Sequence, residues 1–248
     1  MLEISAAEMT DRIRIALVGA AGRMGRAIID IANSEGAEVV ARMDLDDPLV
    51  ATNADALIDF SSAAAAESVC HAAATSNVAL VIGTTGHSPE EKKIIETAAH
   101  KIPVVLASNF SIGVNVLFSL TERAAKILGD DFDLEIVEVH HRLKKDAPSG
   151  TATTLTEILR RVRRSNSLRH GREGLVGARE KTEIGVHSVR GGDVVGDHTV
   201  IFAGNGERLE LTHRASSRET FARGAVRAAR WLIGKSPRLY DMRDVLGL

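Results

Sequence analysis

A strand-like run followed by a turn with regularly spaced glycines constrains the fold of this chain most. Ile13–Val18 is a short β-branched run, and Gly19-Ala20-Ala21-Gly22-Arg23-Met24-Gly25 follows it directly. Apolar residues then recur at helical spacing from Met24 to Ile31. Glycines between a strand and a helix let the backbone approach a pyrophosphate, which the helix N–H groups and dipole attract. The pattern predicts a dinucleotide-binding turn, although Ala21 stands where the usual motif has its second glycine. An ordinary tight turn is the alternative.

Asp44 favours the dinucleotide interpretation. It lies 25 residues after Gly19, at the end of a second apolar run, Val39–Met43. An acidic residue at about this distance binds the hydroxyls of the adenosine ribose. A surface carboxylate is the alternative, because Asp46 and Asp47 lie beside it. Since strand, glycines, helix and acid occur in the expected order, we favour dinucleotide binding.

The rest of the first half alternates apolar runs with stretches of helical length. The runs are Ala56–Phe60, Val78–Ile82 and Pro103–Ala107, and the intervening stretches are 63–76 and 89–100. This alternation predicts βαβ units and a parallel sheet. Gly83-Thr84-Thr85-Gly86 and Ala107-Ser108-Asn109-Phe110 occupy the ends of the last two runs, where open parallel sheets hold ligands. They are candidate cofactor contacts, with ordinary turn chemistry as the alternative.

The second half has a different pattern. Helices are expected over 114–128 and 151–163, and strands over 134–139, 183–190, 194–202 and 208–213. Gly191-Gly192-Asp193 and Gly204-Asn205-Gly206 are hairpin signals between the last three strands, which predicts an antiparallel meander. A final helix, Glu219–Ile233, is expected to return to the first domain. The predicted fold class is α/β: a Rossmann-type parallel-sheet domain, residues 1–111 and 219–248, with an inserted α+β domain, residues 112–218, that carries a mixed or antiparallel sheet.

The segment His140–Thr151 concentrates basic side chains before a Ser149-Gly150-Thr151 turn. His140 and Lys144 are four residues apart and are able to share one face. A cationic pocket of this kind suits a dianionic substrate and provides a proton donor, while the turn offers hydroxyl and N–H groups to a carboxylate. A solvated loop or a helix cap is the alternative. No metal site is predicted, because adjacent histidines rarely bind one ion and no partners show ligand spacing.

Composition excludes several other classes of protein. The 31 basic and 33 acidic residues nearly balance, and only 3% of residues are aromatic, which argues against a nucleic-acid partner. We interpret the arginines between 160 and 172 as a solvated surface. The single cysteine, Cys70, excludes an intrachain disulfide framework. No run of about 18 apolar residues occurs, and residues 1–12 lack an apolar signal region, so we expect no membrane partner and a cytoplasmic location.

The motifs together resemble the 4-hydroxy-tetrahydrodipicolinate reductase family. The resemblance spans about residues 12–246 and is carried by the glycine turn, Ile58-Asp59-Phe60-Ser61, Gly83-Thr-Thr-Gly86, residues 107–115, Glu138–Thr151, residues 190–198 and Ala215–Phe221. It implies reduction of a cyclic imine dicarboxylate to tetrahydrodipicolinate with NADH or NADPH and release of water, in lysine and diaminopimelate biosynthesis. It also implies a homotetramer that assembles through the inserted domain.

The resemblance assigns roles residue by residue. His140 corresponds to a proton donor and acceptor and Lys144 to a proton donor. His141, Ser149, Gly150, Thr151 and Arg218 correspond to substrate contacts. Gly19, Ala20, Ala21, Gly22, Arg23, Met24, Asp44, Gly83, Thr84, Thr85, Ala107, Ser108, Asn109 and Phe110 correspond to cofactor contacts.

Two questions stay open at this point. Relatives often carry arginine after the acidic ribose-binding residue, and Leu45 occupies that position here. This difference predicts a preference for NADH over NADPH. The alternative functions are an NAD-dependent dehydrogenase for another small acid and an NAD-binding sensor without catalysis.

Overall fold

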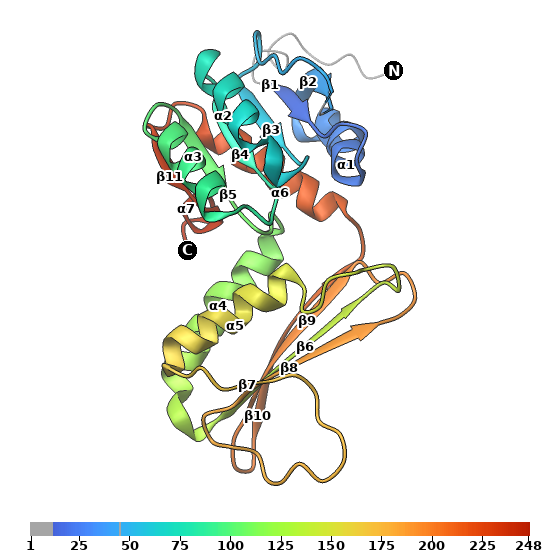
Figure 1. Cartoon of the computed structure of the whole chain (residues 1–248), viewed down its shortest axis with the longest axis vertical. Helices are drawn as coiled ribbons and strands as arrows, with labels where there is room; N and C mark the ends of the chain where they lie inside the picture. The colour runs from blue at the N-terminus through green and yellow to red at the C-terminus, as the bar shows by residue number, and fades with distance from the viewer. Residues whose placement is uncertain (1–11, 45) are drawn as a thin grey trace. The chain divides into compact units, whose positions relative to one another are not determined.

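The computed structural model describes residues 12–44 and 46–248, which form two compact units (Figure 1). The first contains the chain up to Ile112 and again from Arg218 to the C-terminus, and the second contains Gly113–Ser217. The interpretation of residues 1–11 as lacking a signal region, and the position of Leu45, lie outside the described residues. The helix that follows Arg218 belongs to the first unit.

The first unit is built on a six-stranded sheet in which every pairing is parallel. Its strand order is β11-β5-β4-β3-β1-β2. The strands are β1 (Ile13–Val18), β2 (Ala37–Met43), β3 (Ala56–Asp59), β4 (Ala79–Ile82), β5 (Pro103–Leu106) and β11 (Arg238–Tyr240). Every residue of β3 and β4 is buried, because helices cover both faces of this sheet.

Helices cover the two faces of this sheet from different parts of the sequence. The helices of this unit are α1 (Arg23–Ala32), α2 (Ala66–Thr75), α3 (Pro89–Ala99), α6 (Glu219–Leu232) and α7 (Met242–Leu246). The residues of α1, α6 and α7 share one apolar core with β1 and β3, and those of α2 and α3 share the other with β4. The helix α3 begins with a capping box, in which Ser88 and Glu91 accept each other's backbone N–H.

The second unit places two helices on one face of a five-stranded mixed sheet. Its strand order is β10-β9-β6-β8-β7. The elements are α4 (Ile112–Leu128), β6 (Asp133–His140), α5 (Gly150–Arg163), β7 (Leu168–Arg169), β8 (Ile184–Arg190), β9 (Gly196–Ala203) and β10 (Arg208–Ala215). Alternate residues of β6 are buried against α4 and α5, among them Leu134 and Ile136.

One predicted connection is wrong. The glycines at 191 and 192 indicated a hairpin between β8 and β9, but β6 lies between these two strands. It pairs in parallel with β8 and antiparallel with β9. The hairpin between β9 and β10 does form. The difference arises because a glycine turn fixes only the reversal of the chain, whereas β6, in which every second residue is buried along the whole strand, suits a central position with a partner on each side.

Candidate active site

The glycine turn of the first unit is shaped by close backbone approaches. Gly19 has a positive φ of 81°, and a Cβ there would lie 2.4 Å from the carbonyl oxygen of Phe60. A Cβ on Gly25 would lie 2.2 Å from the oxygen of Gly19, so α1 packs directly on the turn. The N-cap of α1 is Gly22, which has no side chain to occupy the first N–H groups of the helix. These features fit a bound pyrophosphate.

Asp44 directly follows β2 and lies beside the glycine turn. Both of its carboxylate oxygens lie 3.3 Å from the backbone nitrogen of Ala21, which donates to them. The turn is also hydrogen-bonded to β2, because the N–H groups of Gly19 and Ala20 donate to the oxygen of Met43. The structure therefore brings Asp44 and the glycine turn together at the carboxyl edge of the sheet, as the sequence predicts for a dinucleotide site.

The segments 83–86 and 107–110 lie at the same edge of the sheet. Some of their side chains make contacts within the protein, and others are exposed. The hydroxyl of Thr84 donates to the buried carboxylate of Asp59 at 2.7 Å and accepts from the N–H of Ser61 at 2.9 Å. Burial raises the pKa of Asp59, against the opposing hydrogen bonds from Ser61 and Thr84. Phe110 is buried and contacts the ring of Phe60 edge-on. Thr84 and Phe110 thus hold the edge together from within the protein.

Thr85 and Ser108 are exposed at this edge, and Gly83 and Asn109 are partly buried there. A Cβ on Gly83 would collide with the ring of Phe60, at 2.1 Å from its Cε1. The amide oxygen of Asn109 accepts from the N–H of Ser111 at 2.8 Å. Glycine at position 83 is therefore needed for packing, whatever it contacts in a ligand.

Arg218 also belongs to the first unit, at the N-cap position of α6. Burial, and then the charge of Arg23, lower the pKa of Arg218. Arg218 is therefore near enough to Arg23, the residue after Gly22 of the glycine turn, for their charges to interact. The other predicted substrate contacts, His141, Ser149, Gly150 and Thr151, belong to the second unit.

The basic segment of the second unit starts at the end of β6. His140 is the last residue of the strand and is buried, with 8% of its surface exposed. The chain then turns, with the N–H of Lys144 donating to the oxygen of His141. The Lys144 ammonium lies 2.9 Å from a carboxylate oxygen of Asp146. Its charge is near enough to contribute to a lowered pKa of His140, for which burial is the main cause. The structure therefore groups His140 and Lys144.

The predicted turn at 149–151 is the start of α5. The hydroxyl of Ser149 accepts from the N–H of Ala152, so Ser149 is the N-cap. Gly150 is exposed, and a Cβ built on it meets nothing within 4 Å. The first turn of α5 thus presents open backbone beside the basic segment, as required for binding a carboxylate.

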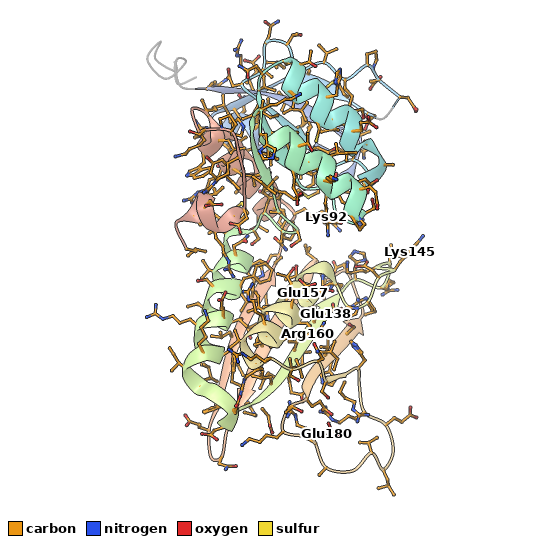
Figure 2. The ribbon with its side chains drawn as sticks, turned by 60° about the vertical axis from the view of Figure 1, so that its left-hand side comes forward. Lys92, Glu138, Lys145, Glu157, Arg160 and Glu180 are labelled. Atoms are coloured by element: carbon orange, nitrogen blue, oxygen red, sulfur yellow. The ribbon has the colours of Figure 1, made fainter. Side chains whose placement is uncertain are left out.

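Three residues around His140, two of them buried, were not singled out from the sequence. Glu138, fully buried on β6, lies 2.5 Å from Nδ1 of His140. Arg190 of β8 donates to both carboxylate oxygens of Glu138, at 2.9 and 2.8 Å. Glu138 lies on β6, which packs against α5, the helix that carries Glu157 and Arg160 (Figure 2). The sequence contained one signal for Glu138: it lies two residues before His140, and residues two apart share one face of a strand.

His198 of β9 completes the cluster. Its ring lies edge-on to that of His140, with 5.1 Å between the centroids, and its Nε2 lies 3.0 Å from the hydroxyl of Ser149. Burial is the main reason that the pKa of His198 falls to about 3, and the charge of His140 adds to it. His198 is therefore a neutral ring that supports the N-terminus of α5.

Two features are absent from the described residues. Among residues 12–44 and 46–248, no three His, Cys, Asp or Glu side chains gather in a way that could hold a metal ion. In the same part of the chain, no helix is long and apolar enough to cross a membrane.

A parallel-sheet unit with a dinucleotide-type turn, together with a second unit that carries a buried histidine beside a lysine, defines a two-domain oxidoreductase of the NAD(P)-dependent class. Residues 13–110 match the family described as dihydrodipicolinate reductase, N-terminus, and residues 113–246 match dihydrodipicolinate reductase, C-terminus. The chain belongs to the dihydrodipicolinate reductase family.

Individual relatives agree with this assignment. The chain is 55% identical to the 4-hydroxy-tetrahydrodipicolinate reductase of Akkermansia muciniphila over 242 residues, covering 95% of this chain and 98% of the relative. It is 46% identical over 264 residues to the enzyme of the same name from Anaeromyxobacter dehalogenans, with 95% and 98% covered. Among solved structures, the dipicolinate-bound dihydrodipicolinate reductase of Paenisporosarcina sp. TG-14 has a TM-score of 0.75 and 25% identity, covering 93% and 97% of the two chains.

Proposed function

We propose that this protein reduces 4-hydroxy-tetrahydrodipicolinate to tetrahydrodipicolinate with NADH or NADPH, in lysine and diaminopimelate biosynthesis. The observation that carries the proposal is the buried His140 beside Lys144, at the open N-terminus of α5, in a chain 55% identical to a reductase of that name. The reaction takes up one hydride and one proton and releases one water. It works where reduced nicotinamide cofactors are available, so we propose the cytoplasm as its location.

The first unit is the proposed cofactor domain. The N-terminus of α1 and the glycine turn bind the pyrophosphate, and Asp44 accepts from the ribose hydroxyls. The segments 83–85 and 107–110, in which Thr85 and Ser108 are exposed, flank the same edge of the sheet. When bound, the reduced nicotinamide supplies the hydride. Arg23 and Arg218 add positive charge near the glycine turn, which favours an anionic ligand group.

The second unit is the proposed substrate and assembly domain. Its α5 N-terminus, with Gly150 and Thr151, binds a substrate carboxylate, and His141 assists. The dicarboxylate in the relative from Paenisporosarcina supports this class of ligand. Loss of the 4-hydroxyl group as water leaves a carbon–carbon double bond conjugated with the imine. Addition of the hydride to that double bond leaves an electron-rich enamine, which must take up one proton to give the cyclic imine product. His140 or Lys144 then supplies the proton.

An assay of NADH oxidation with enzymatically generated 4-hydroxy-tetrahydrodipicolinate tests this function. We expect turnover that depends on the substrate and stops when it is left out. Binding of NADH without turnover would instead support a non-catalytic sensor. Turnover only with a different small acid or semialdehyde would support the other dehydrogenase alternative.

A further inference from the structure

We propose that Glu138 and Arg190 are positioning residues for His140. Together they fix the imidazole with its hydrogen on Nδ1 and leave Nε2 as the atom that exchanges a proton with the substrate. Only the role given to Nε2 rests on the proposed function, because the tautomer is a property of the protein alone.

The hydrogen-bond donors around Glu138 determine the tautomer. Oε1 accepts from Nη2 of Arg190 at 2.8 Å and from the N–H of Ser149 at 3.2 Å. Oε2 accepts from Nη1 of Arg190 at 2.9 Å and lies 2.5 Å from Nδ1 of His140. A carboxylate bound by a guanidinium at both oxygens is ionised and only accepts hydrogen bonds. The hydrogen in the contact with His140 is therefore on Nδ1.

Arg190 also balances the charge of Glu138. Its guanidinium is anchored a third time, by donation from Nη2 to the backbone oxygen of Asp146 at 2.7 Å. Although burial opposes ionisation, hydrogen bonds from Arg190, Ser188 and His140 hold the pKa of Glu138 at about 2. A buried carboxylate without Arg190 would strongly favour a protonated imidazole beside it. With Arg190 present, His140 keeps a lowered pKa and stays neutral near pH 7.

The charged and titratable groups that face His140 come from four places. They are Glu138 on its own strand, Arg190 on β8, His198 on β9 and Lys144 in the following turn, itself paired with Asp146. Burial of the ring is the main cause of the lowered pKa of His140, with Lys144 and Arg190 adding to it and Glu138 opposing it. Removal of Glu138 or of Arg190 should therefore shift this pKa in opposite directions.

Gly196 of β9 lies beside Nε2 of His140. A Cβ at this residue would lie 3.0 Å from Nε2 of His140 and 3.4 Å from its Cδ2. Such contacts are tighter than an ordinary van der Waals approach. Glycine at the start of β9 therefore keeps that strand from crowding the nitrogen opposite the Glu138 contact.

The experiment is an NMR titration of protein labelled with ¹⁵N-histidine, without cofactor or substrate. In the wild type we expect His140 to carry its hydrogen on Nδ1. Glu138→Gln should move the hydrogen to Nε2, because Arg190 takes the amide oxygen and the amide N–H₂ faces Nδ1. It should also lower the pKa of His140, whereas Arg190→Met should raise it.

Glu135→Gln is the matched control. Glu135 lies on the same strand, accepts from Arg172 and Arg179, and has Oε2 2.7 Å from Nε2 of His187. This variant should change the signals of His187 and leave those of His140 in place. A change at His140 of the same size as in Glu138→Gln would mean that general damage to the sheet explains both.

Turnover provides the second readout. Glu138→Gln should lower kcat/KM by roughly 10²–10⁴-fold, the usual contribution of a positioned general acid or base, and displace the pH profile. Glu138→Asp should recover part of the loss. Gly196→Ala should lower kcat while leaving the tautomer unchanged.

Several outcomes would overturn the proposal. One is a wild-type His140 with its hydrogen on Nε2, which needs no variant to fold. Another is a shift of the His140 pKa in the same direction in Glu138→Gln and Arg190→Met. Unchanged turnover in Glu138→Gln with an altered tautomer would remove the role of Nε2. A wild-type protein without reductase activity would contradict the proposed function and leave the NMR result standing.

Discussion

At the scale of single residues, His140 and Lys144 are expected to serve chemistry and not cofactor binding. We predict that His140→Ala and Lys144→Ala each lower turnover by about 10²–10⁴-fold, because an electron-rich product must be protonated. Both residues belong to the second unit, whereas the glycine turn and Asp44 belong to the first. The affinity for NADH, measured by fluorescence titration, should therefore change little. Wild-type turnover in either variant would remove the proposed role of that residue.

Cofactor preference is also decided by single side chains. The carboxylate of Asp44 faces the turn backbone at Ala21 and is placed to accept from ribose hydroxyls, but it repels a 2′-phosphate. Leu45, outside the described residues, brings no positive charge. Arg42, two residues before Asp44, and Arg23, at the start of α1, are both exposed and partly offset the repulsion. We predict that NADH is preferred about ten-fold, or about 1.4 kcal/mol.

Comparison of kcat/KM for NADH and NADPH at fixed salt and substrate measures this preference. Leu45→Arg should raise the efficiency with NADPH more than that with NADH, and Leu45→Met is the uncharged control. Equal efficiencies in the wild type would show that another cation reaches the 2′-phosphate.

His198 links a single side chain to acid stability. Its pKa, lowered to about 3 mainly by burial, lies well below the 6.5 expected for an unfolded chain. As the pH falls below 6.5, His198 binds a proton in the unfolded chain but not in the folded protein. The free energy of unfolding therefore decreases progressively down to about pH 3. Each unit of difference corresponds to about 1.4 kcal/mol, for a total of a few kcal/mol. His198→Gln should flatten this part of the curve of unfolding free energy against pH, measured by urea titration. An unchanged slope would contradict the argument.

At the scale of elements, the close packing of α1 on the glycine turn should affect the affinity for the cofactor. A Cβ on Gly25 would lie 2.2 Å from the oxygen of Gly19 and 2.6 Å from the Cα of Ala20. Because both neighbours are backbone atoms, the contact is relieved only if α1 shifts as a whole relative to the turn. We predict that Gly25→Ala weakens NADH binding by at least about ten-fold and destabilises the protein by about 1–3 kcal/mol. Arg26→Ala, at the next and exposed position, is the control. Calorimetry and thermal unfolding measure both effects, and an unchanged Kd in Gly25→Ala would contradict the prediction.

The elements of the first unit could be predicted well because their signals are local. Buried parallel strands such as β3 and β4 form continuous apolar runs, and the capping box at Ser88 marks the start of α3. The short elements β7, β11 and α7 were missed. A strand of two or three residues is too short to show a hydrophobic periodicity in the sequence. The strand β11 is recognised only by its pairing with β5.

The candidate site shows the same division between local and distant signals. His140, Lys144 and Ser149 lie within one segment and were found there. Arg190 and His198 reach the site from β8 and β9, which flank β6 in an order that the turns between them do not determine. Because the meander was predicted instead, the contact of Arg190 with Glu138 could not be derived from the sequence.

At the scale of the whole molecule, one face of the second sheet carries apolar side chains that lie outside the core formed with α4 and α5. The helices α4 and α5 cover the face that carries Ile136 and Val200. The alternate residues of the same strands, including Val137, Val139 and Ile201, point to the other face and are partly buried at most. Val189, paired with Val139, is 47% exposed. Apolar side chains on an open sheet face favour association with another chain.

We therefore propose a homotetramer that assembles through this face of the second unit, as the family resemblance also implies. Light scattering at micromolar concentration should give four times the chain mass of 26.5 kDa. Val189→Asp should reduce the assembled mass, because it would bury a charge without a partner at the interface. Ile127→Asp is the matched control: Ile127 is 74% exposed but lies on α4, which packs on the opposite face of the sheet, so this variant should remain a tetramer. A monomeric mass for the wild type would refute the tetramer. A tetramer that Val189→Asp leaves intact would place the interface elsewhere on the molecule.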